Sequence, residues 1–125
     1  DQVAWTRSRG TPYVPSLLLY DGGLYFLSHY QNVLSRVDAR TGENRPGQFR
    51  LPGIGNVYSS PVAAANRIYI TDLKGNTVVI SSGDAPRPLA LNHVAESVSA
   101  SPAIAGRQLF LRGETSLYCL EETEN

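Results

Sequence analysis

The stretch SSPVAAANRIYITDLKGNTVVI, from Ser59 to Ile80, contains the structural pattern that the whole chain repeats. A Ser-Pro step opens a short apolar strand, and a tight turn at Asn66-Arg67 reverses the chain. A second strand follows over residues 68–70, and a polar turn leads into a third strand that ends at Ile80. The stretch therefore predicts a small antiparallel meander.

The same pattern occurs twice more in the chain. It reads VPSLLLYDGGLYFLSHYQNVLSRV over residues 14–37 and SASPAIAGRQLFLRGETSLYCL over residues 99–120. Aligning Leu17, Pro61 and Pro102 gives spacings of 44 and 41 residues. Repeats of about 40 residues that each contain several short strands are typical of β-propeller blades.

The number of strands predicts how the blades are completed. The repeats span about residues 13–53, 57–95 and 98–122 of a single domain, and no helical stripe interrupts them. The first two repeats have room for four strands, the third for three, and Val3–Arg7 remains as one further strand. A propeller blade has four strands. We therefore predict an all-β propeller segment of three four-stranded antiparallel blades, with Val3–Arg7 as the outer strand of the last blade.

Two local features carry specific expectations. In the turn that begins at Asp38, the side chains of Asp38 and Thr41 can accept hydrogen bonds from nearby backbone N–H groups, while Gly42 takes a positive φ. Cys119 lies in an alternating strand pattern, which predicts a small core residue. As the single cysteine, it cannot form an intrachain disulfide.

Composition narrows the classes of partner. The 11 Lys and Arg residues balance 11 Asp and Glu residues, and no run of like charge occurs. We therefore expect no nucleic-acid partner. No apolar stretch approaches the roughly 18 residues of a membrane span, so we expect no membrane insertion. No signal peptide is recognised, and a chain that begins with Asp1 fits a processed protein or an excised piece.

With these motifs in place, the chain resembles the PQQ-like β-propeller repeats over nearly its whole length. This family contains the quinoprotein dehydrogenases and the BamB-like outer-membrane assembly factors. The resemblance rests on the Ser-Pro strand openings, the hairpins, and the Asp-x-x-Thr-Gly turn at Asp38, Thr41 and Gly42. In the family this turn precedes a Trp that docks between blades, and Trp5 looks like such a residue. The chain departs from the pattern at Leu17, where the family usually has Pro, and around Pro46, where the Trp would fall.

The resemblance also raises the question of a quinone cofactor. Cofactor-binding members hold PQQ with a stacked Trp, a Ca²⁺ site of carboxylate and amide ligands, and often a vicinal disulfide. This chain has one cysteine, and Trp5 is better explained by blade packing. No acidic or amide cluster falls at matching positions, so we expect no cofactor. PQQ and calcium belong to an alternative hypothesis, in which the chain is the C-terminal fragment of a quinone-dependent dehydrogenase.

Other catalytic sites find little support in the sequence. His29 and His93 are the only histidines, which excludes a three-histidine metal site in one chain. His29 lies in a turn, where a solvated side chain is the simpler explanation. No Gly-x-Ser-x-Gly elbow and no Gly-rich phosphate loop occurs. We therefore assign no catalytic and no metal-binding residue.

A binding surface is the better-supported expectation. In a propeller, the loops that enter the inner strands and the turns between the two middle strands share one face around the axis. This rule selects Arg9, Tyr13, His29, Tyr30, Asn56, Tyr58, Asp72, Lys74, Arg112 and Glu114. Tyrosine and arginine are common on recognition surfaces. The alternative is that the tyrosines wall the channel and the charged residues are solvated turn positions.

Three blades also predict a need for neighbours. Closed propellers have about four to eight blades, and the flanks of an open segment would expose apolar surface. We expect either self-association, in which two chains supply six blades, or the remaining blades of a longer propeller. The sequence thus predicts a non-catalytic module for binding or protein scaffolding, and the resemblance implies a periplasmic or extracellular location. A BamB-like assembly factor with a protein partner is a further alternative.

Overall fold

The chain folds into three antiparallel sheets. The computed structural model describes residues 2–28 and 32–121, and in these ranges it contains no helix. The first sheet consists of β1 (Leu18–Tyr20), β2 (Gly23–Leu27), β3 (Val33–Asp38) and β4 (Asn44–Arg50). The second consists of β5 (Val62–Ala64), β6 (Arg67–Thr71), β7 (Asn76–Ser81) and β8 (Pro88–His93). The third consists of β9 (Ala103–Ala105), β10 (Gln108–Arg112) and β11 (Leu117–Glu121).

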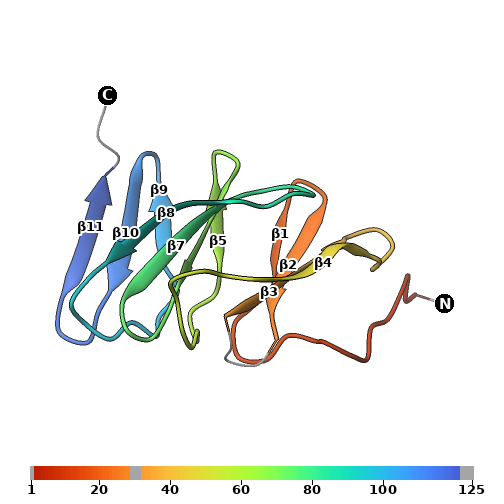
Figure 1. Ribbon diagram of the computed structural model, residues 1–125, viewed down its shortest axis with the longest axis horizontal. Helices are drawn as coiled ribbons and strands as arrows, with labels where there is room; N and C mark the ends of the chain where they lie inside the picture. Colours follow the sequence, from red (N-terminus) through yellow and green to blue (C-terminus); the bar gives the residue numbers. More distant parts are fainter. Residues whose placement is uncertain (1, 29–31, 122–125) are drawn as a thin grey trace.

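The sheets stand side by side as blades, with their first strands next to one another. Strand β1 contacts β5, and β5 contacts β9, whereas each later strand pairs within its own sheet. Figure 1 shows the three sheets in chain order, with the two termini at opposite ends of the row. The sequence-based prediction of an all-β segment of three propeller blades is confirmed.

A serine in each repeat joins one blade to the next. The backbone N–H of Ser16 donates to Ser60 Oγ over 2.8 Å, and the backbone N–H of Ser60 donates to Ser101 Oγ over 2.9 Å. These serines immediately precede the aligned positions in the sequence, 44 and 41 residues apart. The Ser-Pro step therefore opens the inner strand and also links neighbouring blades near the axis.

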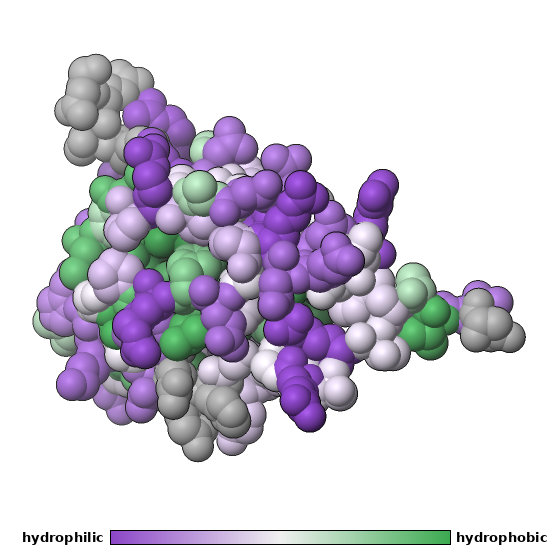
Figure 2. All heavy atoms as spheres, turned by 45° about the vertical axis from the view of Figure 1, so that its right-hand side comes forward, coloured by the Kyte–Doolittle hydropathy of each residue, from purple (hydrophilic) through white to green (hydrophobic). Residues whose placement is uncertain are grey.

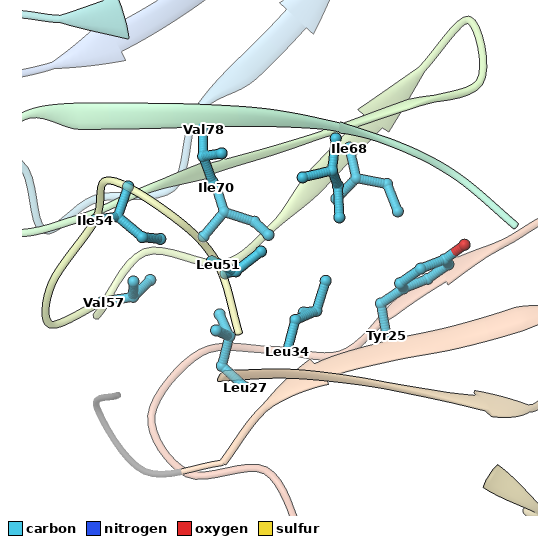
Figure 3. Close-up of a cluster of buried hydrophobic side chains, with 10 residues drawn as sticks. Tyr25, Leu27, Leu34, Leu51, Ile54, Val57, Ile68, Ile70 and Val78 are labelled. Carbon is cyan, nitrogen blue, oxygen red and sulfur yellow. The ribbon is translucent and has the colours of Figure 1, made fainter. Parts of the chain in front are cut away.

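Apolar side chains fill the space between the first and second blades (Figure 3). The buried cluster consists of Tyr25, Leu27, Leu34, Leu51, Ile54, Val57, Ile68, Ile70, Val78 and Ile80. Alternate residues of the first sheet contact alternate residues of the second. The loop between the two sheets contributes Leu51, Ile54 and Val57. The second and third blades share a smaller buried cluster of Val94, Val98 and Leu111, with Leu109, Tyr118 and Leu120 half-buried against it.

A buried arginine completes the first interface. Arg36 is 6% exposed, and its Nε donates to the Tyr25 hydroxyl over 3.0 Å. Its Nη1 pairs with Asp84 Oδ1, from the loop between β7 and β8, over 2.8 Å. The Tyr25 hydroxyl also accepts the N–H of Gly83 over 2.9 Å. A buried charge is tolerated where it is paired and hydrogen-bonded, so this network fixes the second blade to the first.

The structure corrects the prediction for Val3–Arg7. This segment is not a strand, and the described part of the third sheet has three strands, ending at β11. Instead, the Trp5 Nε1–H donates to the Ala39 carbonyl over 3.0 Å, and the Arg7 guanidinium lies 5.8 Å from the Phe26 ring centroid. The physical reason is distance: the segment lies at the opposite end of the row from β11, beside the first blade (Figure 1).

The turn after β3 forms as the sequence predicts. Asp38 Oδ1 accepts the N–H groups of Arg40 and Thr41 over 2.8 and 3.2 Å, and Thr41 Oγ1 accepts that of Glu43 over 3.3 Å. Gly42 has a φ of 75°. A Cβ there would lie 2.6 Å from the Trp5 ring, so the glycine also makes room for the tryptophan. The Arg40 N–H is the largest cause of the lowered pKa of Asp38.

The prediction of Cys119 as a core residue is wrong. Cys119 is exposed, and Leu117, two residues earlier on the same face of β11, is 74% exposed. Alternation correctly separates the two faces of β11, because Tyr118 and Leu120 pack toward the second blade. The opposite face is exposed because no described segment packs over it.

Candidate functional site

The predicted face is assembled by hydrogen bonds between loops. It consists of the loops before the inner strands (residues 9–17, 52–61 and 95–102) and the turns at residues 72–75 and 113–116; we call it the axial face. The Leu73 N–H donates to the Asn56 carbonyl over 2.8 Å, and the Val98 N–H donates to the Leu73 carbonyl over 3.2 Å. One turn of the second blade therefore holds the loops on both of its sides.

The residues proposed from the sequence occupy different environments on this face. Those that are exposed are Arg9, Tyr13, Asn56, Tyr58, Lys74, Arg112 and Glu114. Asp72 is buried, with 1% of its surface exposed. His29 and Tyr30 lie outside the described residues.

Asp72 organises the face from inside. Its Oδ1 accepts the N–H groups of Lys74 and Asn76, each over 2.9 Å. Its Oδ2 accepts the Gly55 N–H over 2.9 Å and the Asn76 Nδ2–H over 3.0 Å. Four donors surround one carboxylate, and one of them belongs to the preceding loop. Asp72 therefore closes its own turn and ties this turn to the loop that enters the blade.

Glu96 performs the corresponding function in the third blade. Its carboxylate accepts the Thr115 N–H over 2.6 Å and is also hydrogen-bonded by the hydroxyls of Thr115 and Tyr118. Hydrogen bonds from the Thr115 side chain, then from Tyr118, lower the pKa of Glu96 to about 2. The same contact with Glu96 raises the pKa of Tyr118. A Cβ on Gly113 would lie 2.7 Å from Glu96 Oε2, so a larger residue there would displace the carboxylate.

Glu96 was not proposed from the sequence, although the repeats contain a signal for it. Alignment of the second and third repeats places Gly55 with Glu96 and Asp72 with Gly113. The carboxylate and the glycine have exchanged places. A search for such exchanges between aligned repeats would have identified Glu96 as a loop-to-turn contact.

Two cavities open among these loops. One of about 230 Å³ is lined by Ser97, Ser99, Arg112, Gly113 and Glu114. A larger one of about 360 Å³ is lined by Gly10, Thr11, Pro12, Tyr13, Ser28, Val33 and Gln48. The structure thus brings Arg112 and Glu114 together at the third blade and places Tyr13 in a separate cavity at the first.

The face of the molecule drawn in Figure 2 has a mixed surface. Figure 2 shows hydrophobic atoms gathered toward the side opposite the N-terminal tail, whereas the middle of this view is largely hydrophilic. Within residues 2–28 and 32–121, no three or more His, Cys, Asp or Glu side chains form a group able to hold a metal ion. No helix in the described ranges is long and apolar enough to cross a membrane.

Comparison with known proteins gives a structural likeness only. No family model matches the sequence, and neither does any curated protein. Among solved structures, BamB from Moraxella catarrhalis aligns with 94% of this chain at a TM-score of 0.71 and 13% identity. A europium-containing methanol dehydrogenase aligns with 90% of the chain at a TM-score of 0.66 and 17% identity. The chain has the PQQ-like β-propeller fold that both share, and it spans 36% and 23% of their respective lengths.

Proposed function

We propose that this chain is a non-catalytic binding module that contacts its ligand or protein partner through the axial face. The observation that carries this proposal is the pair of cavities among the axial loops, lined by side chains that include Tyr13 and Arg112. Aromatic and arginine side chains on a rigid scaffold are common at recognition surfaces. The likeness to BamB supports a protein partner, as in a scaffold or assembly factor, without identifying one.

Capture from an extract of the source cells tests this proposal. The immobilised chain is compared with a Tyr58→Ser, Arg112→Ser variant, which changes two exposed positions of the axial face. A Leu89→Ser variant is the matched control, since Leu89 is 48% exposed on the outer strand β8. We expect a retained protein to be lost with the axial variant alone. Retention that is equal for all three proteins, or lost only with Leu89→Ser, would refute a role for the axial face.

A second candidate function follows from the likeness to a methanol dehydrogenase. Under this alternative the chain is a fragment of a quinone-dependent dehydrogenase. Titration with PQQ and Ca²⁺, followed by absorbance and melting temperature, separates the two functions. We expect no stoichiometric change for a binding module. A saturable, stoichiometric shift would instead favour the dehydrogenase.

We also propose that the exposed flanks are covered by further blades, either from other copies of this chain or from a longer propeller. The support is the apolar surface on β11, where Leu117 is 74% exposed. Light scattering of the isolated chain distinguishes these sources. A two-chain, six-blade assembly would have twice the 13.6 kDa mass of the chain, whereas a stable monomer would rule out self-association.

A further inference from the structure

The larger cavity lies where the other two repeats contain a carboxylate. Two positions define this place in each repeat: one in the loop before the inner strand and one directly after the second strand. The aligned pairs are Thr11 and Ser28, Gly55 and Asp72, and Glu96 and Gly113. The second and third pairs each contain one acidic residue, whereas the first contains none.

In the second and third repeats, the one carboxylate of each pair joins the loop to the turn. In the second repeat it comes from the turn, where Asp72 receives the Gly55 N–H of the loop over 2.9 Å. In the third it comes from the loop, where Glu96 receives the Thr115 N–H of the turn over 2.6 Å. The two side chains reach the junction from opposite directions. In the second and third repeats one carboxylate thus joins loop to turn, irrespective of which segment supplies it.

In the first repeat none of the residues 2–28 and 32–121 places a carboxylate here. Thr11 and Ser28 both line the 360 Å³ cavity, and Ser28 Oγ is buried with no hydrogen-bond partner among residues 2–28 and 32–121. The neighbouring amide has also changed partner. Asn76 Nδ2 donates to Asp72 over 3.0 Å, whereas the aligned Asn32 Nδ2 donates to the Leu51 carbonyl over 3.1 Å.

The size of the cavity and the arginines near its lining residues favour an anionic group. At about 30 Å³ per water molecule, a cavity of this size holds roughly ten waters, which is ample for a carboxylate and its substituent. The described lining residues carry no charge, so none of them repels an anion. Arg9 directly precedes the lining residue Gly10, whose carbonyl accepts the Arg7 Nε–H over 3.4 Å, and Arg50 pairs opposite Val33 across the sheet. Nearby arginines raise the local concentration of anions.

We infer that the cavity at Thr11 and Ser28 binds a carboxylate group supplied by the ligand of the axial face, in place of the side chain present in the other repeats. This inference rests on the proposed binding function. Hydroxyl groups donate strong hydrogen bonds to carboxylates, and Thr11 and Ser28 provide two of them. The carboxylate can belong to a small organic acid or to an acidic side chain of a protein partner, because the recognised chemistry is the same.

Amide NMR titration of the chain tests the inference directly. The probes are sodium acetate, sodium chloride at equal ionic strength, and acetamide as the uncharged analogue of acetate. We expect acetate alone to give saturable shifts at the amides of Thr11, Ser28 and Gln48, without shifts at Gly55 or Gly113, where the protein supplies its own carboxylate. Equal shifts with chloride, or no saturable shift, would overturn the inference.

A blocked Gly-Asp-Gly peptide, with Gly-Asn-Gly as its control, distinguishes the two sources of the carboxylate. Tighter binding of the acidic peptide than of acetate would indicate a protein side chain, and comparable binding would indicate that a small acid suffices. Both outcomes support a carboxylate site. Equal binding of the two peptides would count against it.

Variants of the cavity provide the second readout. Ser28→Asp copies the second repeat and should fill the site, so that acetate no longer binds. Ser28→Ala should weaken acetate binding about tenfold through loss of a hydrogen bond to a charged group. Ser35→Ala is the matched control, because Ser35 Oγ is also buried without a described partner but lies outside the cavity. Unchanged acetate binding in Ser28→Asp and Ser28→Ala would disprove the site.

If the chain fails to bind acetate but still captures a partner through Tyr58 and Arg112, the binding function stands and only its proposed chemistry is wrong.

Discussion

The two blade-to-blade interfaces are built from the same repeat and yet are held together differently. The interface between the first and second blades buries ten side chains in one apolar cluster and adds the Arg36 network. The interface between the second and third buries three, and beside it Glu96 of the connecting loop contacts Thr115 and Tyr118 of the third blade. Because apolar burial is worth roughly 25 cal/mol per Å², the first interface should contribute more to the free energy of unfolding. The repeat fixes the geometry of docking, and the local side chains determine how strong it is.

The largest expected effect is a cavity in the first interface. Ile70→Ala removes a fully buried side chain from the ten-residue cluster and should lower the free energy of unfolding by about 2–5 kcal/mol. The aligned substitution Leu111→Ala, in the second interface, should cost less because fewer buried side chains surround it. Urea denaturation of both variants measures the difference. Equal losses would show that the two interfaces are equally strong.

The next effect concerns the buried hydroxyl of Tyr25. Tyr25→Phe removes the acceptor of both Arg36 Nε–H and Gly83 N–H, and should cost about 1–3 kcal/mol because it leaves buried donors without a partner. The control is Asp84→Asn. Its side chain is 62% exposed, and asparagine keeps an oxygen that can accept the Arg36 Nη1–H, so this variant should cost less than Tyr25→Phe. A larger loss for Asp84→Asn than for Tyr25→Phe would contradict this assignment.

The contacts of Glu96 beside the second interface should depend on pH. Hydrogen bonds lower the pKa of Glu96 from 4.5 to about 2 in the folded chain. A group with a lowered folded pKa stabilises the fold fully above its unfolded pKa, and this contribution is lost as the pH falls through the folded value. Wild type should therefore exceed Glu96→Gln in melting temperature near neutral pH. The difference should shrink between about pH 4.5 and pH 2 and vanish below it. A melting-temperature difference that is constant over this pH range would show that the ionised carboxylate of Glu96 does not cause the stabilisation.

The smallest effect is expected on the uncovered face of β11. Leu117→Ser changes a side chain that is 74% exposed and should alter the free energy of unfolding of a single chain by no more than about 0.5 kcal/mol. If copies of the chain associate through this face, the same variant should shift the assembly toward monomer in light scattering. A loss of several kcal/mol in the monomer would mean that Leu117 packs within its own chain.

Much of the fold could be predicted because it depends on short-range chemistry. The turn from Asp38 to Gly42 forms from side chains that bond their own neighbouring N–H groups, so the local sequence is sufficient. The repeat spacing likewise located the inner strands, since Ser16, Ser60 and Ser101 hold equivalent places in the three blades. Glu96 and Ser28 were not proposed for the candidate site. The aligned repeats contain a signal for Glu96, whereas the burial of the Ser28 hydroxyl beside a cavity depends on how the loop and the strands pack.

By itself, the sequence determined the three repeats, their antiparallel strands and the turn chemistry, because period-2 alternation and local hydrogen bonds act within a few residues. The tertiary structure alone decided which flank Trp5 and Arg7 cover, that Cys119 is exposed, and that the buried Ser28 hydroxyl lines a cavity. These outcomes depend on which blades are neighbours and on which surfaces no described segment covers. Contacts between residues far apart in the chain set them, and no local pattern encodes such contacts.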